Sequence, residues 1–87
     1  AKKLYETGIL YLKMDEYEPA RMSFNRVLDQ YYDTDIIERV HFGVIQSYVK
    51  DNKLDQAKEY WLGQGHRDIV TEELISEIDQ LFAESEK

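Results

Sequence analysis

The residues that could do chemistry are two histidines and several groups of carboxylates, and their spacing does not favour catalysis. His41 and His66 fall on different predicted elements, and His66 with Asp68 would need at least one more ligand to hold a metal ion. His41 falls where one predicted helix meets its neighbour, a position typical of a packed side chain. The carboxylates have the spacing of helix caps and turns, and they cluster at residues 15–18, 33–35 and 72–73. Because no Ser–His–Asp spacing, glycine-rich phosphate loop or nucleophile elbow occurs, we expect no enzyme activity, no metal and no cofactor.

The composition favours a protein partner. The chain has 87 residues, with 11 Lys and Arg against 18 Asp and Glu, which gives a net charge of −7. Nucleic acids and anionic membrane surfaces attract basic proteins, so the acidic composition argues against both as partners. It favours solubility and a basic protein partner. The absence of cysteine excludes disulfides and cysteine zinc sites. No apolar run approaches ~20 residues and no signal peptide is present. Since the sequence begins inside a predicted repeat, we expect a fragment with its targeting signals upstream.

Residues 1–34 predict two antiparallel helices joined by a tight turn. The first helix, over residues 1–14, has an apolar face made of Leu4, Gly8, Tyr11 and Leu12. The second helix, over residues 15–30, has an apolar face made of Ala20, Phe24, Val27 and Leu28. Asp15 and Glu18 have capping-box spacing, and Pro19 is tolerated only in a first helical turn, so we expect the second helix to begin at Asp15. Gly8 and Ala20 are small, which would let the two helices approach closely.

The same pattern returns 37 residues later (48 − 11). Tyr11, Ala20 and Phe24 correspond to Tyr48, Ala57 and Trp61. Residues 35–65 therefore predict a second hairpin. Its first helix should open at Asp35 and Glu38, again with capping-box spacing, and run to Lys50. Its second helix should run from Leu54 to Leu62, where Gly63-Gln64-Gly65 suits a C-cap. The loop between the hairpins includes the aromatic pair Tyr31 and Tyr32.

Residues 66–87 differ from the hairpins and contain an amphipathic helix over 71–85. Thr71 is its predicted N-cap. Its apolar face consists of Leu74, Ile75, Ile78, Leu81 and Phe82, and its outer face carries the acidic residues Glu77, Asp79 and Glu84. Two interpretations remain open: the helix caps the last hairpin, or it docks into the groove of a partner. In both cases the segments 1–34, 35–65 and 66–87 form one domain.

The sequence resembles two known groups of proteins. Leu4, Gly8, Tyr11, Ala20 and Phe24 match the spacing of a tetratricopeptide repeat (TPR), although the period of 37 exceeds the usual period of about 34. Over residues 3–68, LYLKMDEYEPARMSFNRVL and VLDQYYDTDIIERV resemble the C-terminal repeats of the BamD family of outer-membrane protein assembly lipoproteins, with Tyr32 in place of the family's proline. The resemblance implies an all-α fold, with two TPR-like hairpins and a capping helix in a right-handed α-solenoid.

A TPR register assigns roles to individual positions. It implies a concave, partner-binding face made of Tyr5, Ile9, Leu12, Lys13, Arg39, Phe42, Gln46 and Lys50. It implies helix-packing positions at Gly8, Tyr11, Ala20, Phe24, Tyr48, Ala57 and Trp61. The concave face would be apolar at its centre with a basic rim of Lys13, Arg39 and Lys50. The alternative is that Tyr5, Ile9 and Phe42 pack against a preceding repeat or against the C-terminal helix.

The resemblance further implies a scaffold that holds subunits of the outer-membrane β-barrel assembly machinery. Such a protein would lie on the periplasmic face of the outer membrane, anchored by a lipid upstream of this segment, and this segment itself would not insert into the membrane. One alternative is a generic TPR adaptor for a peptide or helix, which would be cytoplasmic. Another is a repeat domain that forms homo-oligomers through its outermost helices.

Overall fold

The computed structural model describes residues 2–30, 34–65, 69 and 71–86, and these residues form helices and turns without a strand. Its helices are α1 (Lys2–Lys13), α2 (Tyr17–Gln30), α3 (Thr34–Lys50), α4 (Leu54–Tyr60), the π-helical turn η1 (Trp61–Gly65) and α6 (Glu72–Ser85). The predicted all-α fold class is confirmed. The right-handed solenoid stays a prediction. Tyr31, Tyr32, His66 and Asp68, which the sequence singled out, lie outside the described residues.

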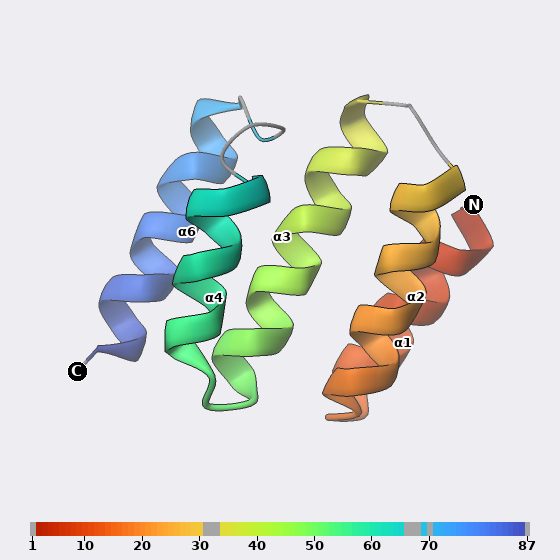
Figure 1. Cartoon of the computed structure of the whole chain (residues 1–87), viewed down its shortest axis with the longest axis horizontal. Helices are drawn as coiled ribbons and strands as arrows, with labels where there is room; N and C mark the ends of the chain where they lie inside the picture. The colour runs from red at the N-terminus through yellow and green to blue at the C-terminus, as the bar shows by residue number, and fades with distance from the viewer. Residues whose placement is uncertain (1, 31–33, 66–68, 70, 87) are drawn as a thin grey trace.

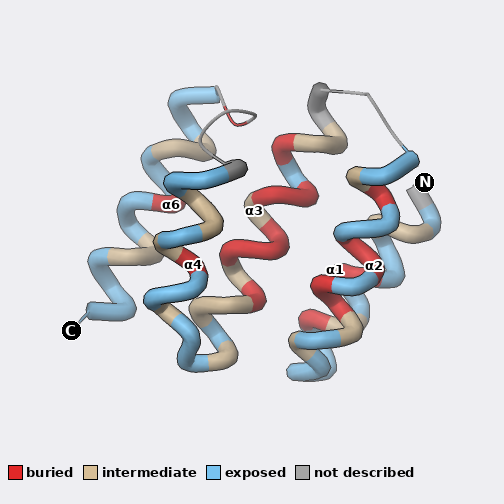
Figure 2. The backbone as a smooth tube through the Cα atoms, viewed as in Figure 1, coloured by how far each residue is buried: buried red, intermediate tan, exposed pale blue. Residues whose placement is uncertain are grey.

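Helix α3 is the centre of the molecule, because it contacts all the other described helical elements. The helices α1 and α2 form an antiparallel hairpin on one side of it, and α4 and α6 pack on the other side (Figure 1). Each helix runs opposite to the one before it, so that α6 runs in the same direction as α3 (Figure 1). Figure 2 shows buried residues along most of the length of α3.

The turns that close the two hairpins have the same backbone hydrogen bonds, 37 residues apart. In the first turn the amide of Glu16 donates to the carbonyl of Tyr11 at 2.9 Å, and in the second the amide of Lys53 donates to the carbonyl of Tyr48 at 2.8 Å. The residue before each donor has a left-handed backbone with φ of 60°, namely Asp15 and Asn52. Short polar side chains tolerate this conformation well. The repeat seen in the sequence thus has a counterpart in backbone geometry.

The core consists of two clusters of buried apolar side chains that meet at α3. The first joins α1, α2 and α3 and contains Leu12, Ala20, Phe24, Val27, Val40 and Val44. The second joins α3, α4 and α6 and contains Ile45, Ala57, Ile69 and Ile78. Ala20 and Ala57, the equivalent positions of the two hairpins, are both fully buried.

Phe24 fixes the distance between the first hairpin and α3. Its fully buried ring lies between Gly8 of α1 and Gly43 of α3. A Cβ atom added to Gly8 would lie 2.5 Å from Cε1 of the ring, and one added to Gly43 would lie 2.8 Å from Cε2. Glycine is required at both positions because no other residue leaves room for the ring at this helix spacing.

Three predicted helix boundaries need correction. Helix α2 begins at Tyr17, so Asp15 is not its cap: the left-handed Asp15 belongs to the turn, and its side chain accepts a hydrogen bond from the Tyr17 hydroxyl at 3.0 Å. This bond, made by the neutral phenol, raises the pKa of Tyr17 above the ordinary 10.0, and the charge of Asp15 acts in the same direction. Helix α3 begins at Thr34, one residue before Asp35. The chain also stays helical through Gly63, as the wider turn η1, and none of the described glycines has positive φ.

Candidate protein-binding surface

A groove runs between α3 and α6. It consists of two adjoining depressions of about 430 and 290 Å³, which share Glu77. The first is lined by Glu38, Arg39, Thr71, Glu73, Leu74 and Glu77, and the second by Phe42, Gln46, Glu77, Gln80, Leu81 and Glu84. The half-buried side chains of Phe42, Leu74 and Leu81 form an apolar floor. We refer to these two depressions together as the α3–α6 groove.

Packing and one buried carboxylate hold α6 beside α3. Ile78 of α6 is fully buried against Ile45 in the second core cluster. The side chain of Glu38 is only 5% exposed, and its Oε2 accepts a hydrogen bond from the backbone amide of Thr71 at 3.0 Å. Thr71 is the N-cap of α6 but makes no side-chain capping bond. Glu38 therefore satisfies an amide at the start of α6 and fixes that end of the groove.

The edges of the groove are polar and mostly acidic. Glu73, Glu77 and Glu84 of α6 are exposed. Within the part of the chain that the structure describes, the base that lines the groove is Arg39 of α3, which is exposed as well. The basic residues predicted for the rim of the concave face are not gathered here, because Lys13 lines a separate depression on α1 and Lys50 does not line the groove. The edge of this groove is acidic because α6 brings Glu73, Glu77 and Glu84 beside α3.

The predicted partner-binding residues divide among four places. Arg39, Phe42 and Gln46 line the α3–α6 groove. A separate depression on α1 is lined by Tyr5, Glu6, Ile9, Leu10 and Lys13. There the Tyr5 ring also packs on Phe24, with ring centroids 6.0 Å apart. Leu12 is only 6% exposed and belongs to the first core cluster, so its assignment to the binding face is corrected to the core. Lys50 is exposed at the end of α3.

The positions assigned to helix packing all lie at helix contacts. Gly8, Ala20, Phe24 and Ala57 are buried. Tyr11 and Tyr48 are half-buried and pack against the first core cluster, and Trp61 packs against the second. Gly43 of α3 also lies at such a contact, against the Phe24 ring.

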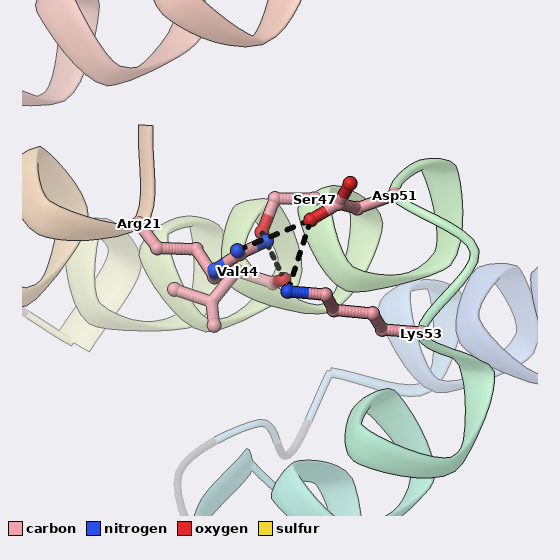
Figure 3. A network of polar contacts seen from close by, with 5 residues as sticks. All are labelled: Arg21, Val44, Ser47, Asp51 and Lys53. Atoms are coloured by element: carbon pink, nitrogen blue, oxygen red, sulfur yellow. Dashed lines mark hydrogen bonds and ion pairs between the residues drawn. The ribbon is translucent and has the colours of Figure 1, made fainter. Parts of the chain in front are cut away.

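One buried polar cluster was not expected from the sequence. Arg21 reaches from α2 to the end of α3, where it donates to Oγ of Ser47 at 3.4 Å and to Oδ2 of Asp51 at 3.3 Å (Figure 3). Its guanidinium carbon also lies 4.4 Å from the centre of the Tyr48 ring. Lys53 approaches the same carboxylate at 3.4 Å. Arg21 follows Ala20 directly, at the edge of the apolar face, which was the available signal that it joins the first hairpin to the second.

His41 lies in a buried contact between α3 and α4. His41 is only 3% exposed, and its Nδ1 lies 2.6 Å from the hydroxyl of Tyr60 on α4. Within the described ranges, no group of three or more His, Cys, Asp or Glu residues could hold a metal ion. His66 and Asp68, which were considered as metal ligands from the sequence, lie outside those ranges.

Comparisons with protein-family models, with curated proteins and with solved structures found no match to this chain. Among the described residues, no helix combines the length and the apolar character that crossing a membrane would require.

Proposed function

We propose that this chain is a protein-interaction module that holds a segment of another protein in the α3–α6 groove. The observation that carries the proposal is the apolar floor of Phe42, Leu74 and Leu81 between exposed polar edges. Protein interfaces commonly have such an anatomy, with an apolar centre that contains an aromatic residue and a polar rim. A groove between two helices suits a third helix, which would continue the packing that already joins α3 to α6.

Site-specific crosslinking tests this proposal. A photo-reactive amino acid is placed at Gln80, on the edge of the groove, and in a matched variant at Gln56, which is exposed on α4. The full-length protein is irradiated in the cells that produce it, and the captured protein is identified by mass spectrometry and purified. We expect one defined partner to crosslink at position 80 and not at position 56.

Reconstitution with the purified partner completes the test. Gln80→Trp covers the floor of the groove with an indole, and Gln56→Trp makes the same change on α4. The first should weaken binding by about tenfold or more, and the second should leave it unchanged. Equal crosslinking at both positions, or equal affinity of both tryptophan variants, would refute the proposal.

The resemblance over residues 3–68 supports a narrower proposal, that the partner is a subunit of the outer-membrane protein assembly machinery. An intact mass of the full-length native protein tests it: a diacylated N-terminal cysteine agrees with a periplasmic lipoprotein, and an unmodified N-terminus without an export signal rejects it in favour of a cytoplasmic adaptor. The rival within the binding class is a generic adaptor for a peptide or helix. Self-association is an alternative of another class, and a concentration-dependent mass in solution would reveal it.

A further inference from the structure

We infer that the segment held in the α3–α6 groove is a cationic amphipathic helix of about three turns. This inference rests on the proposed function and adds the chemistry of the partner. The apolar side of the helix would lie on the floor of the groove, and its Lys or Arg side chains would meet the carboxylates of α6. The carboxylates in question are Glu73, Glu77 and Glu84.

The acidic residues follow the whole edge of the groove. Glu73, Glu77, Gln80 and Glu84 lie at i, i+4, i+7 and i+11, so they share one face of α6. Eleven residues at ~1.5 Å each give an edge of about 16 Å, which is three turns of a helix. A partner helix of that length could place one cation opposite each of the three carboxylates.

These carboxylates have no compensating charge on their own helix. The sequence of α6, EELISEIDQLFAES, contains five acidic residues and no Lys or Arg. Glu73 and Glu77 repel each other across one helical turn. Glu84 lies in the last turn, where the helix dipole disfavours an anion. Residues that destabilise a helix locally are expected where function requires them. Binding of a cationic helix would reduce the repulsion between Glu73 and Glu77 and the unfavourable interaction of Glu84 with the helix dipole.

Across the groove, Arg39 is the base among the described lining residues, against three exposed carboxylates of α6. The exposed edges are therefore acidic in sum, as is the chain, with a net charge of −7. A cationic partner is steered to such a surface and an anionic one is repelled.

Two synthetic helical peptides of about three turns provide the probe. Both carry the same leucine face, and their polar positions carry Lys in one peptide and Glu in the other. Binding to the full chain is measured by fluorescence anisotropy at about 0.05 M and about 0.3 M salt. We expect the Lys peptide to bind at least about tenfold more tightly than the Glu peptide, and to lose affinity at the higher salt concentration.

Charge reversals locate the site. Glu77→Lys should weaken binding of the Lys peptide by about tenfold, because it replaces an attraction by a repulsion in the middle of the groove. Arg39→Glu should strengthen binding of the same peptide. The matched control is Asp29→Lys, which makes the same change in net charge at an exposed position on α2 and should change the affinity less than about twofold. Circular dichroism checks that each variant remains helical.

Several results would overturn the inference. They are equal affinity for the two peptides, no binding of the Lys peptide, and an equal loss in Asp29→Lys and Glu77→Lys, which would show that only the net charge matters. The two proposals fail separately. A cellular partner that crosslinks specifically at Gln80 but contacts the groove with acidic residues overturns the cationic helix alone. The absence of any crosslink specific to Gln80 overturns the proposed function.

Discussion

Replacing Gly8 by alanine tests how tightly the Phe24 ring is held. The new Cβ would lie 2.5 Å from Cε1 of the ring, and the ring cannot retreat because Gly43 closes its other side. Overpacking of this kind costs about 1–3 kcal/mol in the free energy of unfolding. Alanine in place of glycine in a helix raises the free energy of unfolding by about 1 kcal/mol. The net effect on Gly8→Ala should be a destabilisation of up to about 2 kcal/mol.

Gly63→Ala is the matched control. It makes the same substitution at an exposed helical position where a Cβ would meet nothing within 4 Å. It should therefore be neutral or stabilising by up to about 1 kcal/mol. The difference between the two variants isolates the clash and should be about 1–3 kcal/mol. Urea unfolding followed by circular dichroism measures both free energies of unfolding, and thermal unfolding should place Gly8→Ala about 4–24 °C below Gly63→Ala.

A smaller side chain at position 24 completes the test. Phe24→Leu removes ring atoms beside Gly8, so Gly8→Ala made in that background should no longer destabilise and should fill part of the cavity. If Gly8→Ala and Gly63→Ala have the same stability in the wild-type background, the close approach of α1, the ring and α3 is wrong.

Three further predictions concern the core and the polar contacts. Ala20→Glu should abolish cooperative unfolding, because an unpaired buried carboxylate costs several kcal/mol, while Met22→Glu on the exposed side of α2 should melt like the wild type; equal melting curves would contradict the packing of α2. Arg21→Met should lower the free energy of unfolding by about 1–3 kcal/mol through loss of its hydrogen bonds and its contact with the Tyr48 ring, and an unchanged urea midpoint would refute the link between hairpins. The raised pKa of Tyr17 means that its hydrogen bond stabilises the fold below the ordinary phenol pKa of 10.0 and that this contribution is lost as the pH rises through the folded-state pKa. Asp15→Asn should return the Tyr17 titration, followed by ultraviolet absorbance, toward lower pH, and a titration identical to the wild type would exclude the bond.

The local pattern of the sequence was enough for the helices and the repeat. Apolar spacing predicted the four hairpin helices and the C-terminal helix, since residues three and four apart share a helix face wherever that helix lies. The 37-residue offset also predicted the second hairpin, and the structure shows that its turn has the same backbone hydrogen bonds as the first. The helix boundaries were predicted less accurately: Asp15 and Glu18 have the spacing of a capping box, but backbone hydrogen bonds of the turn place Asp15 outside the helix.

Only the tertiary structure decided which element covers each face. A helical pattern cannot say which neighbour packs on it, because that choice depends on contacts between residues distant in the chain. Leu12 was assigned to a binding face, but α2 and α3 bury it in the first core cluster. Arginine is usually found at the surface, yet the guanidinium of Arg21 lies at a buried contact, where it donates hydrogen bonds to Ser47 and Asp51. The acidic rim exists for the same reason: Glu77 was predicted on an outer face, and the packing of Ile78 turns that face toward α3 and makes it the edge of the groove.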